Sequence, residues 1–147
     1  MTNSTKKQRD SVVDIRIPYA DTDQMGMVYY ANYFVYFERG RTEWLRDKGL
    51  EYRSLESKGI YLPVVESSCR YRSPARYDDI ITVHTVVSDV GACSIEFTYS
   101  IDCGGKVIAE GKTKHPFVNI NMKPVRMPAD IQTILEPESA QKDSCRG

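Results

Sequence analysis

The chain has 147 residues, a length typical of one domain, and folding at that size buries roughly 68–70% of the surface of the unfolded chain. Its 20 lysines and arginines balance its 20 aspartates and glutamates, so no net charge draws it to nucleic acid. No run approaches the roughly 18 apolar residues that cross a membrane, and residues 1–10 are polar. We therefore expect a cytoplasmic protein of one domain that neither binds nucleic acid nor inserts into a membrane.

The four cysteines are at positions 69, 93, 103 and 145, without the close pairs that a zinc site or a redox-active pair requires. Three of them fall in apparent strands, where a small apolar residue suits a core. We expect free thiols, no metal site and no cofactor.

The chain begins and ends with polar segments that lack apolar periodicity. Residues 1–10 and 136–147 are expected to be flexible tails of the single domain, residues 1–147. Between them, residues 12–19 partly alternate and predict a first strand, whose buried face carries Val13, Ile15 and Ile17.

An aromatic helix is predicted over residues 31–49, with Gly49 as its terminator. Helical spacing places Phe34, Phe37, Trp44 and Leu45 on one side. Further apolar residues, Tyr33, Val35 and Tyr36, fall on its remaining sides, so we expect the first half of this helix to be enclosed.

The rest of the chain is dominated by strands. We predict a short turn at residues 51–58, four strands at 60–72, 81–87, 94–101 and 106–119, and a short last helix at 129–135. Gly104-Gly105 is the predicted hairpin turn between the last two strands. This order predicts an α+β protein with a five-stranded antiparallel sheet and one long helix. Because one helix cannot cover both faces and the sheet has two open edges, we expect a homodimer or homotetramer.

Residues 19–34, YADTDQMGMVYYANYF, combine a strand end, two carboxylates, a glycine and a helix start. The free N–H groups of a first helical turn can hold an oxyanion, and Gly26 allows a substrate to approach the backbone. Asp21 and Asp23 are candidate bases. Asp before a helix is also an ordinary capping residue, and the sequence pattern alone does not choose between these roles.

This segment resembles the active-site motif of the 4-hydroxybenzoyl-CoA thioesterase family, and more closely that of its Tol-Pal-associated acyl-CoA thioesterase branch. The resemblance spans roughly residues 12–120 and includes the loop PARYDD at 74–79. Its first motif consists of Tyr19, Asp21, Thr22, Asp23, Gly26, Val28, Tyr29, Ala31, Asn32 and Tyr33. It implies a hotdog fold, in which an antiparallel sheet wraps one long helix, and an acyl-CoA substrate.

Carried over by position, the resemblance implies that Asp23 is the catalytic carboxylate and that the backbone N–H of Tyr30 is the oxyanion donor. Asp23 would attack the thioester or activate a water, and both routes stay open. Asp21 is then expected to order the loop. The expected substrate-binding residues are Gly26, Val28, Phe34 and Leu62.

Two positions depart from the family pattern. Tyr30 stands where the Tol-Pal-associated branch often has histidine, which removes an imidazole but leaves the N–H. Gly91-Ala92-Cys93 stands where the hydroxybenzoyl branch presents basic residues to the CoA phosphates. The available cations are instead Arg70, Arg72, Arg76, Lys123 and Arg126.

Two other functions remain as alternatives. A 3-hydroxyacyl-thioester dehydratase usually requires a histidine with an acid, and His84 and His115 both lie outside the loop-helix motif, in positions that favour structural roles. A non-catalytic acyl-thioester binder or scaffold would not require Asp23. Glu38, on the helix, is a further candidate acid.

Overall fold

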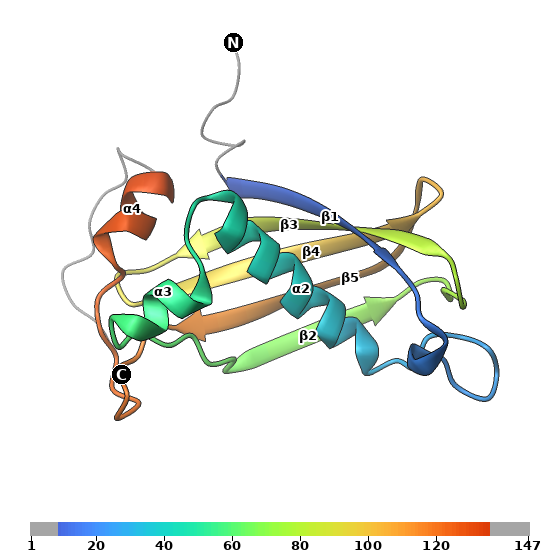
Figure 1. Ribbon diagram of the computed structural model, residues 1–147, viewed down its shortest axis with the longest axis horizontal. Coiled ribbons are helices and arrows are strands. Elements are labelled where there is room, and N and C mark those ends of the chain that lie inside the picture. The colour runs from blue at the N-terminus through green and yellow to red at the C-terminus, as the bar shows by residue number, and fades with distance from the viewer. Residues whose placement is uncertain (1–8, 136–147) are drawn as a thin grey trace, which may run out of the picture.

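The computed structural model describes residues 9–135, so most of the two expected tails lies outside the described residues. Asp10, which we expected in the first tail, instead begins the first strand. Five strands form one antiparallel sheet in the order β1-β3-β4-β5-β2, and a long helix crosses one face (Figure 1). The predicted five-stranded α+β fold is confirmed. The elements are β1 Asp10–Arg16, η1 Tyr19–Asp21, α2 Asn32–Asp47, α3 Tyr52–Ser57, β2 Glu66–Tyr71, β3 Ile80–Val90, β4 Ser94–Cys103, β5 Lys106–Pro116 and α4 Ala129–Leu135.

Strand β4 shows most clearly why the sheet forms. Its apolar residues occupy every second position and are all buried, whereas the residues between them are partly exposed. An antiparallel sheet that is covered on one side requires this alternation. The buried set, which lies under α2, is Ile95, Phe97, Tyr99 and Ile101.

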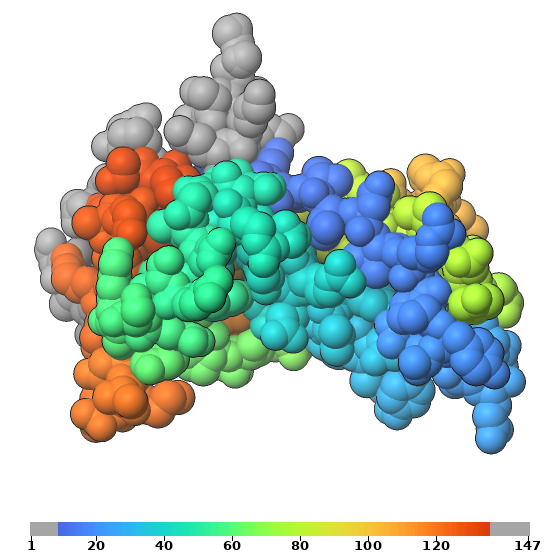
Figure 2. All heavy atoms as spheres, in the orientation of Figure 1, coloured from blue at the N-terminus to red at the C-terminus, as the bar shows by residue number. Residues whose placement is uncertain are grey.

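Helix α2 packs on the sheet through one apolar stripe. The ring of Phe37 stacks on the ring of Tyr99, with centroids 4.4 Å apart and planes 9° from parallel. This close approach depends on Gly111, because an added Cβ there would collide with the Phe37 ring and with the backbone carbonyl of Ser68. The face of the helix that includes Val35 is exposed, as the space-filling view shows (Figure 2). The expectation that the first half is enclosed is therefore wrong for the single chain, because Tyr33 and Tyr36 share the stripe instead of facing away from it.

Two predicted strands are shorter in the structure. The strand predicted at 60–72 is regular only over β2, because Pro63 has no N–H for a ladder and Tyr61 makes an isolated bridge to Val118. The strand predicted at 106–119 ends at Pro116 for the same reason. The chain then turns back, and Val118 also bridges to Pro124.

The cysteines differ from the expectation at one position. Cys69 and Cys103 are free, as expected, but Cys93 is disulfide-bonded, so the expectation of a free thiol there is wrong. Cysteine spacing indicates only pairs that are close along the chain, whereas a disulfide joins residues that folding brings together. Cys145 lies outside the described residues.

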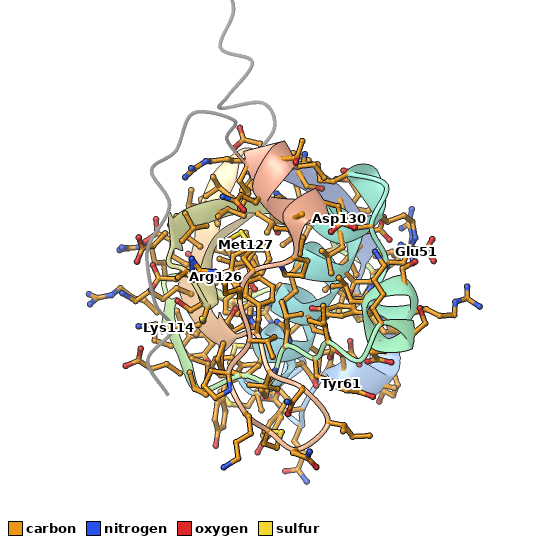
Figure 3. All side chains as sticks on the ribbon, turned by 90° about the vertical axis from the view of Figure 1, so that its left-hand side faces the viewer. Glu51, Tyr61, Lys114, Arg126, Met127 and Asp130 are labelled. Carbon is orange, nitrogen blue, oxygen red and sulfur yellow. The ribbon has the colours of Figure 1, made fainter. Side chains whose placement is uncertain are left out.

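Helices α3 and α4 close the end of the core that is opposite η1 (Figure 3). Ile131 and Leu135 of α4 are buried, and Lys58 forms an ion pair with Asp130 at 3.1 Å. Over residues 9–135, no helix is both long and apolar enough to span a bilayer.

Candidate active site

Residues 22–28 form a tight hairpin that carries Asp23. Thr22 bridges to Val28, and the Asp23 N–H donates to the Met27 carbonyl at 2.8 Å. Gly26 has φ +78°, a conformation that glycine adopts without strain. The sequence therefore specifies this turn through Gly26, and the turn fixes the backbone of Asp23 just before α2.

Asp23 uses one carboxylate oxygen to hold its own turn. Its Oδ1 accepts the N–H groups of Met25 at 2.9 Å and Met27 at 3.2 Å. Within residues 9–135, its Oδ2 has no hydrogen-bond partner. The capping role that the sequence left open is thus present on one oxygen, while the other remains available to a substrate or a water.

Three hydrogen bonds tie Asp21 to the loop-helix junction, two of them to residues of α2. Its Oδ2 accepts the Tyr36 hydroxyl at 2.8 Å, and its carbonyl accepts the side chain of Asn32 and the N–H of Tyr29, both at 2.9 Å. Burial, together with the Asp21 carboxylate, raises the pKa of Tyr36, so this phenol stays a donor. These contacts fit the loop-ordering role that we expected for Asp21.

The first turn of the helix begins before Asn32. Asn32, Tyr33 and Phe34 donate their N–H groups three residues back, to the carbonyls of residues 29, 30 and 31. In the described part of the chain, the N–H groups of Tyr30 and Ala31 have no acceptor. They lie at the positive end of the helix dipole, so they can receive an oxyanion.

Three of the four expected substrate-binding residues lie at this end of the molecule. Gly26 is at the hairpin tip, Val28 is 5% exposed and anchors the hairpin to the Ala75 carbonyl at 2.9 Å, and half-buried Phe34 packs on Phe37. Leu62 follows Tyr61, which lies at the opposite, α3 end (Figure 3). The single chain therefore does not bring Leu62 beside Asp23.

The side chain of Glu38 is exposed on the outer face of α2. Both histidines lie on the sheet: His115 is buried in β5, whereas His84 on β3 is exposed and contacts Asp102 at 3.1 Å. Within the part of the chain that the structure describes, none of the three forms a hydrogen bond or an ion pair with the Asp23 hairpin. Among residues 9–135, no three His, Cys, Asp or Glu side chains gather closely enough to hold a metal ion.

The cations available to CoA phosphates differ in how they are engaged. Arg72 is paired with Glu110 at 2.7 Å. Arg76 lies beside the hairpin, because Met27 and Arg76 form a bridge and a Cβ added at Gly26 would lie 3.8 Å from its Nη1. No acidic residue in the described range forms an ion pair with Arg76.

Sequence reasoning missed two tyrosines that touch the loop-helix junction. One is Tyr36, described above, and the other is Tyr71, whose hydroxyl donates to the Tyr30 carbonyl at 2.9 Å. Tyr36 lies one helical turn beyond Asn32, so its proximity to the loop could have been found from spacing. Tyr71 lies 41 residues from Tyr30, and no local pattern indicates that contact.

Comparisons with known proteins find relatives over most of the chain. The model of the thioesterase-like superfamily matches residues 17–135. The acyl-CoA thioester hydrolase YbgC of Escherichia coli is 31% identical over 119 residues, which cover 80% of this chain and 89% of that protein. The crystal structure of TT1821 from Thermus thermophilus is 36% identical with a TM-score of 0.81, covering 85% of this chain and 96% of that one.

A further solved structure, the DHNA-CoA thioesterase of Staphylococcus aureus, is 27% identical with a TM-score of 0.82, covering 85% of this chain and 87% of that one. The resemblance drawn from the loop-helix motif and the expectation of a hotdog fold are thereby confirmed. The match over most of the chain shows that this protein belongs to the thioesterase-like superfamily of hotdog-fold proteins.

Proposed function

We propose that this protein hydrolyses acyl-CoA thioesters, with Asp23 as the reacting carboxylate and the Tyr30 N–H as the oxyanion donor. The observation that carries the proposal is a pair of N–H groups at the start of α2 that have no acceptor among residues 9–135. They come directly after a hairpin that presents a carboxylate oxygen. The Escherichia coli relative is an acyl-CoA thioester hydrolase and the Staphylococcus aureus neighbour is a DHNA-CoA thioesterase, which supports the same substrate class.

In the proposed reaction, the thioester oxygen points at the first turn of α2 and receives the negative charge that develops there. Asp23 either attacks the carbonyl carbon or removes a proton from a water that attacks it. The C–S bond then breaks, and CoA leaves as a thiolate that takes up a proton. Water supplies the oxygen of the free acid in both routes, directly or through hydrolysis of an acyl-Asp23 anhydride.

The acyl group is proposed to lie against Val28 and Phe34, with Gly26 allowing its close approach to the backbone. Leu62 contacts the acyl group only if a long acyl chain, or a second copy of the protein, connects the two ends of the sheet. Arg76 is our candidate for the CoA phosphates, because it lies beside the hairpin without an acidic partner in residues 9–135.

Product identification tests the proposal against the two alternatives. The purified protein is incubated with short, long and aromatic acyl-CoAs, and with a 3-hydroxyacyl-CoA, and the products are identified by mass spectrometry. We expect free acid and CoA. An enoyl-CoA product would indicate a dehydratase, and tight binding of every acyl-CoA without turnover would indicate a non-catalytic binder.

We also propose that the protein is a homodimer or homotetramer. The edge strand β2 is exposed along most of its length, and its last residue, Tyr71, packs on the exposed ring of Tyr30. An exposed edge and apolar side chains favour pairing with a second copy. Sedimentation at micromolar concentration should give two or four times the chain mass, and a monomer alone would contradict this proposal.

A cytoplasmic location is likewise proposed, supported by the free thiols of Cys69 and Cys103. The disulfide of Cys93 is the feature that argues for an oxidising compartment. Cell fractionation decides between them: recovery with a soluble cytoplasmic marker is expected, and recovery with envelope markers would refute the location.

A further inference from the structure

Tyr71 connects the edge of the sheet to the start of α2. It is the last residue of β2, and its hydroxyl donates to the Tyr30 carbonyl at 2.9 Å. The same carbonyl accepts the Tyr33 N–H at 3.3 Å, so both of its lone pairs are used. The peptide that follows the proposed oxyanion donor is therefore held from the helix and from the sheet.

The ring of Tyr71 is also fixed. It packs edge-to-face on Tyr33, with centroids 5.2 Å apart, and on Tyr30, with centroids 6.4 Å apart. Such aromatic pairs restrict the ring as well as contributing contact area. Burial, followed by the contact with Cys69, raises the pKa of Tyr71 to about 12, so the phenol remains a donor at neutral pH.

The same turn is also held by Asp21, whose carbonyl accepts the Tyr29 N–H and the Asn32 side chain. The N–H groups of Tyr30 and Ala31 lie between these two attachments. An N–H group positioned in advance stabilises an oxyanion without reorganising during the reaction. Donation to the Tyr30 carbonyl also polarises the peptide that carries the Ala31 N–H.

We propose that Tyr71 is a positioning residue for the oxyanion site: its hydroxyl holds the first turn of α2 so that the Tyr30 and Ala31 N–H groups point at the thioester oxygen. This inference rests on the proposed function. It adds a role for a residue of the sheet edge, 41 positions away from Tyr30.

The test compares Tyr71→Phe, which keeps the ring and removes the hydroxyl, with Tyr77→Phe as a matched control. Tyr77 is exposed at the same end of the molecule, and its hydroxyl bonds to no residue in the range 9–135. Loss of one neutral hydrogen bond predicts a fall in kcat of about 2- to 10-fold for Tyr71→Phe, with KM nearly unchanged. Tyr77→Phe should match the wild type.

A spectroscopic readout separates positioning from a merely structural role. An acyl-CoA analogue in which a methylene replaces the thioester sulfur keeps a ketone that cannot be hydrolysed, and a ¹³C label marks that carbonyl for infrared difference spectroscopy. Binding to the wild type should move the carbonyl band to lower wavenumber, and Tyr71→Phe should reduce that shift. A structural role alone would change the amount of folded protein without moving the band.

An unchanged kcat together with an unchanged band in Tyr71→Phe would overturn the proposal. A variant that loses folded protein but gives the wild-type band in its folded fraction would overturn it as well. Because the ketone is not turned over, its band can be recorded whether or not Asp23 is the reacting group. A failure of the catalytic role of Asp23 would appear instead as full turnover by Asp23→Asn, so the two failures are distinguishable.

Discussion

The buried histidine of β5 predicts a specific loss of stability in acid. His115 is fully buried, and its Nδ1 lies 3.2 Å from the Leu62 carbonyl, which can only accept. Nδ1 therefore carries the proton, and Nε2 accepts from the Thr113 hydroxyl at 2.8 Å. Thr113 in turn lies 2.6 Å from the Tyr99 hydroxyl, which receives an N–H of Arg41 at 3.4 Å. Each donor from Arg41 to Thr113 can therefore bond to the next acceptor, ending at Nε2 of His115, provided that His115 is neutral.

Protonation of His115 would make its Nε2 a donor instead of an acceptor. It would also add a second positive charge within the influence of the buried Arg41 guanidinium. Burial first, and the Arg41 charge second, lower the pKa of His115 to about 4 from its ordinary 6.5. Between these two pH values the unfolded chain binds a proton that the folded protein does not, so the free energy of unfolding falls as the pH falls. The full effect is about 3 kcal/mol, and between pH 7.5 and 4.5 it is about 2.5 kcal/mol.

The assay is urea unfolding at pH 7.5 and pH 4.5 for the wild type and for His115→Gln, which cannot titrate. Carboxylates contribute to acid sensitivity in both proteins, so the difference between the two pH dependences isolates the histidine. We expect the wild type to lose about 2.5 kcal/mol more than the variant over this range. His84→Gln, which removes the exposed histidine, should keep the steep wild-type fall. Equal losses in the wild type and His115→Gln would refute the reasoning.

Two further substitutions test the packing that positions the site. Gly111→Ala places a methyl group against the Ser68 carbonyl and the Phe37 ring, and it should cost about 1–3 kcal/mol in urea unfolding; an unchanged stability would show that α2 does not need this close approach. Tyr36→Phe leaves the Asp21 carboxylate without its phenol donor and should cost about 1.5–3 kcal/mol, with a loss below about 0.5 kcal/mol contradicting the anchoring role of that bond.

The sheet and the long helix could be predicted because their signals are local. Alternation along β4 and the stripe of α2 require only the side-chain periods of a strand and a helix. The start of β2 after Pro63 and the end of β5 at Pro116 were missed, although proline's lack of an N–H could have indicated both. The type of each of these elements could thus be predicted from the sequence, but the residues at which the strands begin and end were not.

The candidate site could be proposed from the sequence only through the loop-helix motif and its family resemblance. The hydrogen-bonded chain from Arg41 to His115 crosses α2, β4 and β5, and the Tyr71 contact joins β2 to α2. Both depend on strand register, which is set by tertiary packing rather than by neighbouring residues. The disulfide at Cys93 could not be predicted from the spacing of the cysteines along the chain.

The reaction proposed at the start of α2 depends on the carboxylate of Asp23. The most direct measurement is kcat/KM for thiol release from one good acyl-CoA substrate by the wild type and by Asp23→Asn, which keeps the side-chain oxygen that accepts the turn N–H groups. Positioned acid–base catalysis predicts a loss of about 10²- to 10⁴-fold with the fold intact. If Asp23→Asn stays within about 3-fold of the wild type, its carboxylate serves the turn alone, and the assignment of the site is contradicted.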